Sequence, residues 1–371
     1  MSCPKFLGVA ALIASLPIAA RADSPVGDLL SAEYRAAVAA RLEKAGPNAG
    51  ALAGAIREAP PEHREAVGFL IANMPEGDLQ ALGKDFLLKN VRLAYLAREA
   101  TPWASKVPQE LFFDAVLPYA SVNERRDDWR QDFHDRFLGV VRDSASAGAA
   151  VKRLNVEVFR AFRVQYHASK RPKPDQSPYE SAGAGYASCT GLSILLIDAC
   201  RAVGIPARLV GTPRWTDDSG NHSWVEVWDR EWSFVGASEP TQLNEGWFVG
   251  QAARADESRP EHRIYATSFR ASGTHFPMVW KPGSREVPAE DVTRRYTLRR
   301  KVTIRSPGGP GEITVRLAGR ILAQGPIADS ASFELPGDLE YQIQVHKLDG
   351  SGELSRSVKL SAEPDQVVEV R

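Results

Sequence analysis

Residues 188–208 read SCTGLSILLIDACRAVGIPAR, and this stretch decides the fold of the region around it. Its apolar residues recur at helical spacing, at Leu192, Leu195, Leu196, Ala199 and Val203. Ser188 can cap the start of such a helix, and Gly204 with the nearby Pro206 can end it. The stretch therefore predicts a buried helix that begins at Cys189.

Three runs typical of β-strands follow this helix, at residues 207–212, 222–228 and 232–235. The last two are separated by Asp229-Arg230-Glu231, which allows a hairpin with either a two-residue or a three-residue loop. Extending the first register places His222 opposite Glu239, and extending the second places it opposite Ser238. In either register the two strands are antiparallel. Together with the preceding helix, they predict a helix packed on an antiparallel sheet.

Cys189 and His222 are the candidates for nucleophilic chemistry. A helix start carries partial positive charge and free N–H groups, which lower the pKa of a thiol and can hold an oxyanion. His222 can serve as the base that such a thiol requires, although a histidine at a strand end is often purely structural. Glu239 is the candidate that would orient the imidazole, since Glu226 and Asp229 lie too far along the strand.

The cysteines indicate no disulfide within this helix. Eleven residues of helix separate Cys189 from Cys200 by ~16 Å, and bridged Cα atoms lie within ~7 Å of one another. Cys200 follows the apolar stripe and is predicted to be a core residue. Cys3 falls in the segment that export would remove.

The flanking segments differ in character. Residues 27–166 read as five to seven helices, and the chain beyond Pro282-Gly283 alternates apolar and polar residues in short runs. The predicted organisation is a signal peptide at 1–22, a helical region at 23–154, a helix-on-sheet core at 155–284 and a small all-β, sandwich-like domain at 295–371. The fold class is α+β.

Composition and the N-terminal segment argue against nucleic-acid binding and against insertion in a membrane. The 46 basic and 46 acidic residues cancel, so there is no electrostatic case for nucleic-acid binding. The apolar run of residues 6–20 is too short to span a membrane and ends at an Ala-Arg-Ala cleavage pattern, which predicts export to the periplasm or exterior without membrane insertion. The histidines and cysteines match no metal-ligand motif, and no cofactor is indicated.

Taken together, the motifs resemble the transglutaminase-like superfamily of papain-type cysteine enzymes. The resemblance rests on the Ser-Cys-Thr-Gly-Leu helix start, the Gly-Ile-Pro-Ala-Arg turn at 204–208 and the His-Ser-Trp-Val-Glu strand at 222–226. It implies that Cys189 is the nucleophile and His222 the base. The family usually has Asp-Pro where this sequence has Gly236-Ala237, and Glu239-Pro240 looks like a displaced equivalent.

Three further residues are candidates for substrate contact. Trp224 shares the face of His222 and could line the cleft, whereas Tyr186 and Gln176 could donate to an oxyanion. The expected function is an exported cysteine-dependent acyl-transfer enzyme that acts on peptide or carboxamide bonds of a protein or peptide substrate, as a peptidase, an amidase or a transglutaminase. The alternative is a catalytically degenerate envelope protein that binds proteins or peptidoglycan peptides.

Overall fold

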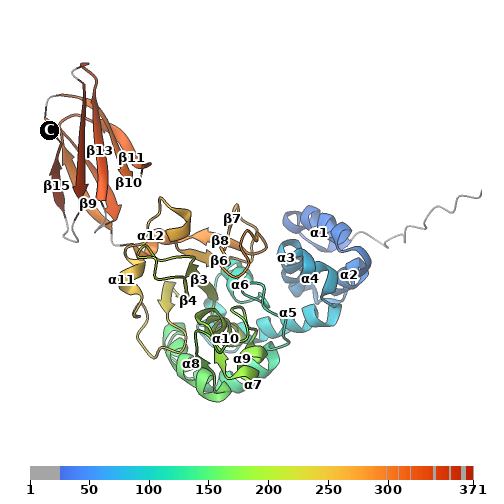
Figure 1. Ribbon diagram of the computed structural model, residues 1–371. Coiled ribbons are helices and arrows are strands. Elements are labelled where there is room, and N and C mark those ends of the chain that lie inside the picture. Colours follow the sequence, from blue (N-terminus) through green and yellow to red (C-terminus); the bar gives the residue numbers. More distant parts are fainter. Residues whose placement is uncertain are drawn as a thin grey trace, which may run out of the picture.

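The computed structural model describes residues 26–297, 299–307, 309–317, 319–336, 340–350, 352–360 and 365–370. Helices α1–α4 lie at one end, a mixed helix-and-sheet body lies in the middle, and a β domain stands at the other end (Figure 1). The α+β fold class is therefore confirmed. The signal peptide predicted at 1–22 lies outside the described residues.

The N-terminal region contains more helices than the sequence predicted. They are α1 (Ala32–Lys44), α2 (Ala49–Glu58), α3 (Arg64–Asn73), α4 (Glu76–Ala81), α5 (Lys84–Glu99), α6 (Gln109–Ala115), α7 (Arg130–Val141) and α8 (Ala147–Phe162). Helices α1–α6 enclose a hydrophobic core of their own, which includes Leu52, Phe69 and Phe112. Helices α7 and α8 belong instead to the central core, because Phe133, Leu154 and Val158 pack with the helix that carries Cys189.

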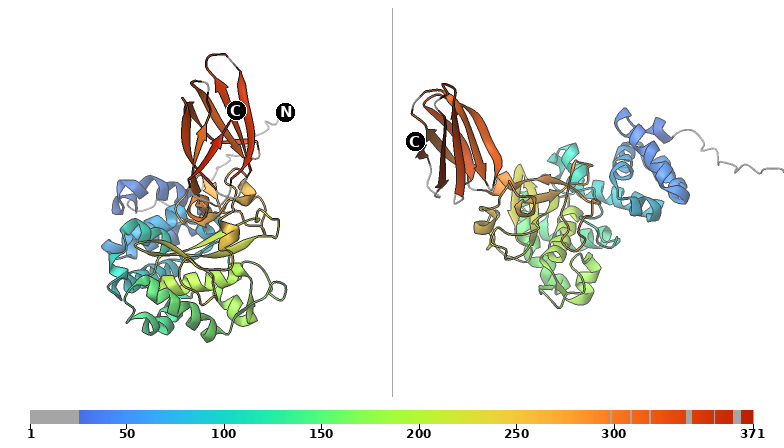
Figure 2. Two further views of the ribbon diagram at one scale, coloured as in Figure 1. Left: turned by 90° about the vertical axis from the view of Figure 1, so that its left-hand side faces the viewer. Right: turned by 45° about the horizontal axis from the view of Figure 1, so that its top comes forward.

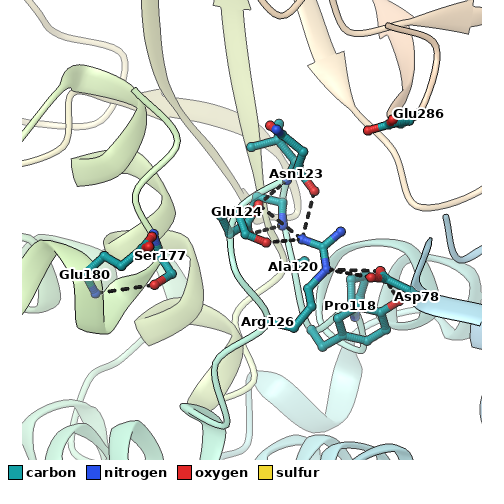
Figure 3. A network of polar contacts seen from close by, with 12 residues as sticks. Asp78, Pro118, Ala120, Asn123, Glu124, Arg126, Ser177, Glu180 and Glu286 are labelled. Carbon is teal, nitrogen blue, oxygen red and sulfur yellow. Dashed lines mark hydrogen bonds and ion pairs between the residues drawn. The ribbon is translucent and has the colours of Figure 1, made fainter. Parts of the chain in front are cut away.

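A partly buried ion pair joins the two helical cores. The Arg126 Nε donates to both carboxylate oxygens of Asp78, at 3.1 and 3.0 Å, and its Nη1 donates to the backbone oxygen of Glu124 at 2.6 Å. Figure 3 shows Arg126 between Asp78 on one side and Glu124 on the other. The hydroxyl of Tyr119 donates to the same aspartate at 2.8 Å. The segment before α7 is thereby fixed to α4.

The central body packs helix α10 (Cys189–Ala202) between α7, α8 and a six-stranded sheet. The sheet order is β5-β4-β3-β6-β8-β7, and its pairings are antiparallel. Its strands are β3 (Ala207–Thr212), β4 (His222–Asp229), β5 (Glu231–Val235), β6 (Tyr265–Thr267), β7 (Thr274–His275) and β8 (Pro288–Asp291). Because β8 returns to this sheet, the core continues beyond residue 284, where the sequence suggested a linker.

Five short elements complete this body. Strand β1 (Gln165–Tyr166) pairs in parallel with β2 (Tyr186–Ala187), which leads directly into α10. Helix α9 (Pro178–Ala184) lies between them, and it begins with a capping box formed by Ser177 and Glu180. Helices α11 (Val249–Ala252) and α12 (Thr293–Tyr296) lie near β3 and β4 (Figure 1).

The β4–β5 hairpin has the second of the two predicted registers. Asp229 pairs with Glu231 across the turn, and the ladder ends at Val225 and Val235. Arg230 occupies the left-handed region, with φ of 71°. His222 therefore lies beyond the β5 ladder, and its partner in the sheet is Thr212 of β3.

The C-terminal strands form two facing sheets, as the sandwich prediction requires (Figure 2). One sheet has the order β11-β10-β13-β14 and the other β12-β9-β15. The strands are β9 (Arg299–Arg305), β10 (Gly311–Leu317), β11 (Arg320–Ile327), β12 (Ser330–Pro336), β13 (Glu340–Lys347), β14 (Glu353–Lys359) and β15 (Gln366–Glu369). Ile304, Val315 and Ile343 lie in the core between them. Within the described residues, no helix is both long and apolar enough to cross a membrane.

Candidate active site

Cys189 is the first residue of α10, and its position is fixed by the capping of that helix. The Ser188 hydroxyl accepts the N–H of Gly191 at 3.1 Å and donates to the backbone oxygen of Pro174 at 2.7 Å. The helix behind it is buried on all sides, so its start cannot shift without disturbing the core. Cys189 and Cys200 are both free, and Cys200 is fully buried, as predicted.

A cleft of about 580 Å³ opens at the start of α10. Its walls come from the β1 segment, α10, the start of β4 and the loops around residues 215–221 and 237–251. The lining residues are Tyr166, Cys189, Leu192, Trp215, Ser219, Asn221, His222, Ser223, Ala237, Ser238, Glu239, Trp247 and Gln251. Cys189, His222 and Glu239 thus face one cavity.

The Cys189 thiol lies against the first residues of β4. Burial raises its pKa above the usual 9.0, although hydrogen bonds from the backbone N–H groups of Ser223 and Thr190 and the charge of Arg171 act in the opposite direction. The hydroxyls of Thr190 and Ser223 lie 3.1 Å apart, which ties the helix start to the strand. The direction of this shift is opposite to the one expected for a thiol at a helix start, because desolvation outweighs the local donors.

His222 is surrounded by aromatic rings. Its ring centre lies 4.7 Å from that of Trp247, 5.0 Å from Phe248 and 5.7 Å from Trp224. Only 8% of the residue is exposed, and the buried Nε2 has no hydrogen-bond partner within the described residues. This burial lowers the pKa of His222 to about 4, so the imidazole is neutral at neutral pH.

The carboxylate of Glu239 has a different partner from the one expected. It accepts the indole N–H of Trp247 at 3.0 Å, and burial raises its pKa. No hydrogen bond between Glu239 and His222 occurs among the described residues. Its role as the group that orients the imidazole remains a prediction.

Asn155 holds the loop that carries Glu239. Its amide nitrogen donates to the backbone oxygens of Gly236 and Glu239 at 2.9 and 2.6 Å, and its side-chain oxygen accepts the N–H of Ser238 at 2.8 Å. Ser238 has a φ of 66°, which non-glycine residues seldom adopt. A buried side chain of α8 therefore fixes a strained turn at the edge of the cleft.

The three predicted substrate contacts do not line this cleft. Trp224 is fully buried beneath His222, and its indole N–H is bound to Tyr296. The amide nitrogen of Gln176 donates to the backbone oxygen of Tyr186 at 3.0 Å, so it is occupied within the protein. Tyr186 packs against His167 and under Lys170. Tertiary packing thus assigns all three residues structural contacts.

Two exposed aromatic residues line the cleft, as was expected of Trp224. Trp247 is 62% exposed and Tyr166 is 60% exposed, and both line the cleft. The sequence does not predict this role for Trp247, because its loop has no periodicity that would set the direction of the side chain. In the described part of the chain, His, Cys, Asp and Glu side chains form no cluster that could hold a metal ion.

The Cys189 helix start and the His222 strand lie in the segment that matches a known family model. Residues 137–248 match the model of the transglutaminase-like superfamily. This segment is a transglutaminase-like domain. Members of the superfamily are cysteine peptidases or acyltransferases. No curated protein matches the sequence.

Two solved structures show remote similarity to the chain. One, from Cytophaga hutchinsonii, is described as a "Putative Cysteine Protease"; it is 19% identical over 44% of this chain, with a TM-score of 0.25. The other is red sea bream transglutaminase, 10% identical over 63% of this chain, with a TM-score of 0.26. The match covers 58% of the length of each of these proteins.

Proposed function

We propose that the protein is a cysteine-dependent acyl-transfer enzyme in which Cys189 attacks a peptide or carboxamide carbonyl and His222 is the base. The observation that carries the proposal is that both side chains line one cleft within a transglutaminase-like domain. The thiol contacts the N–H of Ser223, the residue directly after His222. A carbonyl carbon bound in the cleft can therefore meet the sulfur in a cavity that the imidazole also lines.

The reaction would proceed through a thioester. As the Cys189 sulfur forms a bond to the carbonyl carbon, His222 takes the thiol proton and passes it to the leaving nitrogen, and the C–N bond breaks. Water or an amine then attacks the thioester, His222 takes the proton of that nucleophile, and the proton returns to the sulfur as it leaves. The backbone N–H of Cys189, at the helix start, is a candidate donor to the oxyanion.

The protonation states fit a general-base route and not a preformed thiolate–imidazolium pair. With the pKa of Cys189 raised and that of His222 lowered, the free protein holds a neutral thiol and a neutral imidazole in one cleft. Proton transfer then accompanies attack, and no ion pair need exist before substrate binds. A neutral imidazole is also the form that can accept a proton.

Acylation by p-nitrophenyl acetate tests the proposal without knowledge of the natural substrate. We expect rapid release of nitrophenol and an acetyl group on the Cys189 peptide by mass spectrometry. His222→Gln should slow acylation by about 100-fold, the usual contribution of a general base. Cys200→Ala is the matched control, because that thiol is fully buried and should contribute nothing. Equal acylation rates in wild type and His222→Gln would contradict the proposal.

The competing hypothesis is a degenerate site retained for binding. It is favoured by the raised pKa of Cys189 and by the partner of Glu239, whose carboxylate binds Trp247 and, among the described residues, makes no hydrogen bond to His222. In that case the thiol should react only as its own thiolate forms, with the pH profile of an unassisted cysteine. If the pH profile of the acylation rate shows a second titration that disappears in His222→Gln, the enzyme hypothesis is favoured.

We infer from residues 1–22 that the protein acts outside the cytoplasm, on a protein or peptide substrate. Hydrolysis and transfer differ in the group that resolves the thioester. Adding a primary amine to the acetyl-enzyme distinguishes them: a transferase yields the acetyl amide faster than acetate, whereas a hydrolase yields acetate at an unchanged rate.

A further inference from the structure

His222, Trp224 and Glu226 form a row on one face of β4, because alternate residues of a strand point the same way. The Trp224 ring lies beneath the imidazole, at 5.7 Å between centres and 26° between planes. Trp224 is fully buried, and it also stacks on Phe248 at 4.8 Å. The position of His222 therefore depends on the position of Trp224.

Tyr296 bridges the other two members of this row. Its hydroxyl accepts the indole N–H of Trp224 at 2.9 Å and donates to the Glu226 carboxylate at 2.8 Å. An indole nitrogen can only donate and an ionised carboxylate can only accept, so the direction of both bonds is fixed. The tyrosine ring packs edge-on against Trp224 at 5.3 Å.

Ion pairs hold Glu226 in turn. Its carboxylate pairs with Arg208 of β3 at 2.7 Å and with Arg295 at 3.3 Å. Arg208 lies opposite Glu226 in the β3–β4 ladder and is itself buried. The acceptor of the Tyr296 proton is therefore rigid, and the hydroxyl holds the indole in one orientation.

We propose that Tyr296 is a positioning residue for His222, acting through Trp224. The inference rests on the proposed role of His222 as base. Without the hydroxyl, the buried indole N–H loses its acceptor, and the ring beneath the imidazole is no longer fixed. Tyr296 does not touch the cleft, so any effect on the reacting groups must pass through Trp224.

If Tyr296 positions His222, then the C-terminal end of the core domain helps to hold the candidate active site. Tyr296 is the last residue of α12, and β9 of the C-terminal domain begins at Arg299. Arg299 and Arg294 both pair with Glu257 of the core, so the same short segment anchors the β domain and supports Trp224. An active fragment of this protein should therefore extend through residue 296.

Tyr296→Phe removes only the hydroxyl and is the variant that tests the proposal. We expect acylation by p-nitrophenyl acetate to fall about tenfold, the equivalent of one hydrogen bond. The His222 signal in NMR should titrate at higher pH, because a less tightly packed imidazole is better solvated. Tyr265→Phe is the matched control: it removes a hydroxyl that donates to Pro260 at 2.9 Å, away from the cleft.

A double-mutant cycle tests whether the effect of Tyr296 on His222 passes through Trp224. In a Trp224→Phe background, which lacks the indole N–H, Tyr296→Phe should change neither acylation nor the His222 titration. Additive effects, or a Tyr296→Phe variant that behaves like Tyr265→Phe, would overturn the proposal. The NMR titration keeps the two proposals separate, because it reports the position of His222 even if His222→Gln shows that the histidine is not a base.

Discussion

The carboxylate of Glu239 lies where a side chain on Gly236 would begin. Its Cδ is 2.3 Å from the position of a Cβ built on Gly236, and its two oxygens are 2.4 and 2.6 Å from it. Gly236 is also the position at which the family usually has its aspartate. The Glu239 carboxylate thus lies in the space that an aspartate at 236 would fill, although the hydrogen bond it makes is to Trp247.

The substitution Gly236→Ala tests whether the Glu239 carboxylate occupies this space. The new methyl group must displace the Glu239 carboxylate, and this breaks the bond to Trp247. Because only the end of a flexible side chain moves, the free energy of unfolding should change by less than about 1 kcal/mol. Tryptophan fluorescence should nevertheless change. Gly250→Ala is the control, since nothing lies within 4 Å of its Cβ position; identical spectra for the two variants would contradict the expectation.

Glu239→Gln and Glu239→Ala separate charge from hydrogen bonding. The lowering of the His222 pKa has burial as its cause, with no contribution from Glu239. We therefore expect Glu239→Gln, whose amide oxygen can still accept from Trp247, to keep the wild-type pH profile of Cys189 acylation. Glu239→Ala should slow acylation about tenfold by releasing Trp247. Ser238→Ala should have little effect.

If the glutamate instead orients the imidazole by its charge, as the sequence suggested, Glu239→Gln should impair acylation as severely as Glu239→Ala. Measuring the acylation rate from pH 5 to 9 in the three variants and wild type decides between the two roles.

Local pattern was enough to predict the elements that carry the site. The helix from Cys189 and the strand from His222 follow from spacing and capping residues, and the alternation along β4 correctly placed Trp224 on the face of His222. Whether the Trp224 side chain is buried or exposed could not be predicted from local pattern. Phe248 and Tyr296, which bury Trp224, come from segments far along the chain.

Long-range packing also explains the pKa of Cys189. A helix start lowers a thiol pKa by a local effect that the sequence reveals, whereas burial depends on the tertiary contacts of the cleft walls. The loop at 237–248, which carries Glu239 and Trp247, has no periodicity from which its path could be inferred. The return of β8 to the core sheet is a further long-range pairing that local pattern does not reveal.

The buried imidazole should make stability depend on pH. His222 has a pKa of about 4 in the folded protein against 6.5 for an exposed histidine. Between these values the unfolded chain binds a proton that the folded chain does not, so stability rises as pH increases from about 4 to 6.5. The full difference corresponds to about 3 kcal/mol.

Urea unfolding at pH 4.5 and pH 7 measures this contribution. His222→Gln should reduce the difference in unfolding free energy between the two pH values, whatever its effect at either one. His346→Gln, which replaces an exposed histidine of β13, is the control. An unchanged pH dependence in His222→Gln would show that the imidazole is not buried in solution.

The C-terminal β domain should fold independently of the rest of the chain. Its two sheets enclose a separate hydrophobic core in which Ile343 is fully buried. Tyr296, in contrast, packs with the core of the transglutaminase-like domain. A fragment of residues 297–371 should therefore fold alone, with the circular dichroism of β-strands and a cooperative thermal transition. Ile343→Asp places an unpaired carboxylate in that core and should abolish the transition. A fragment that is unfolded without this substitution would show that the β domain depends on the rest of the chain.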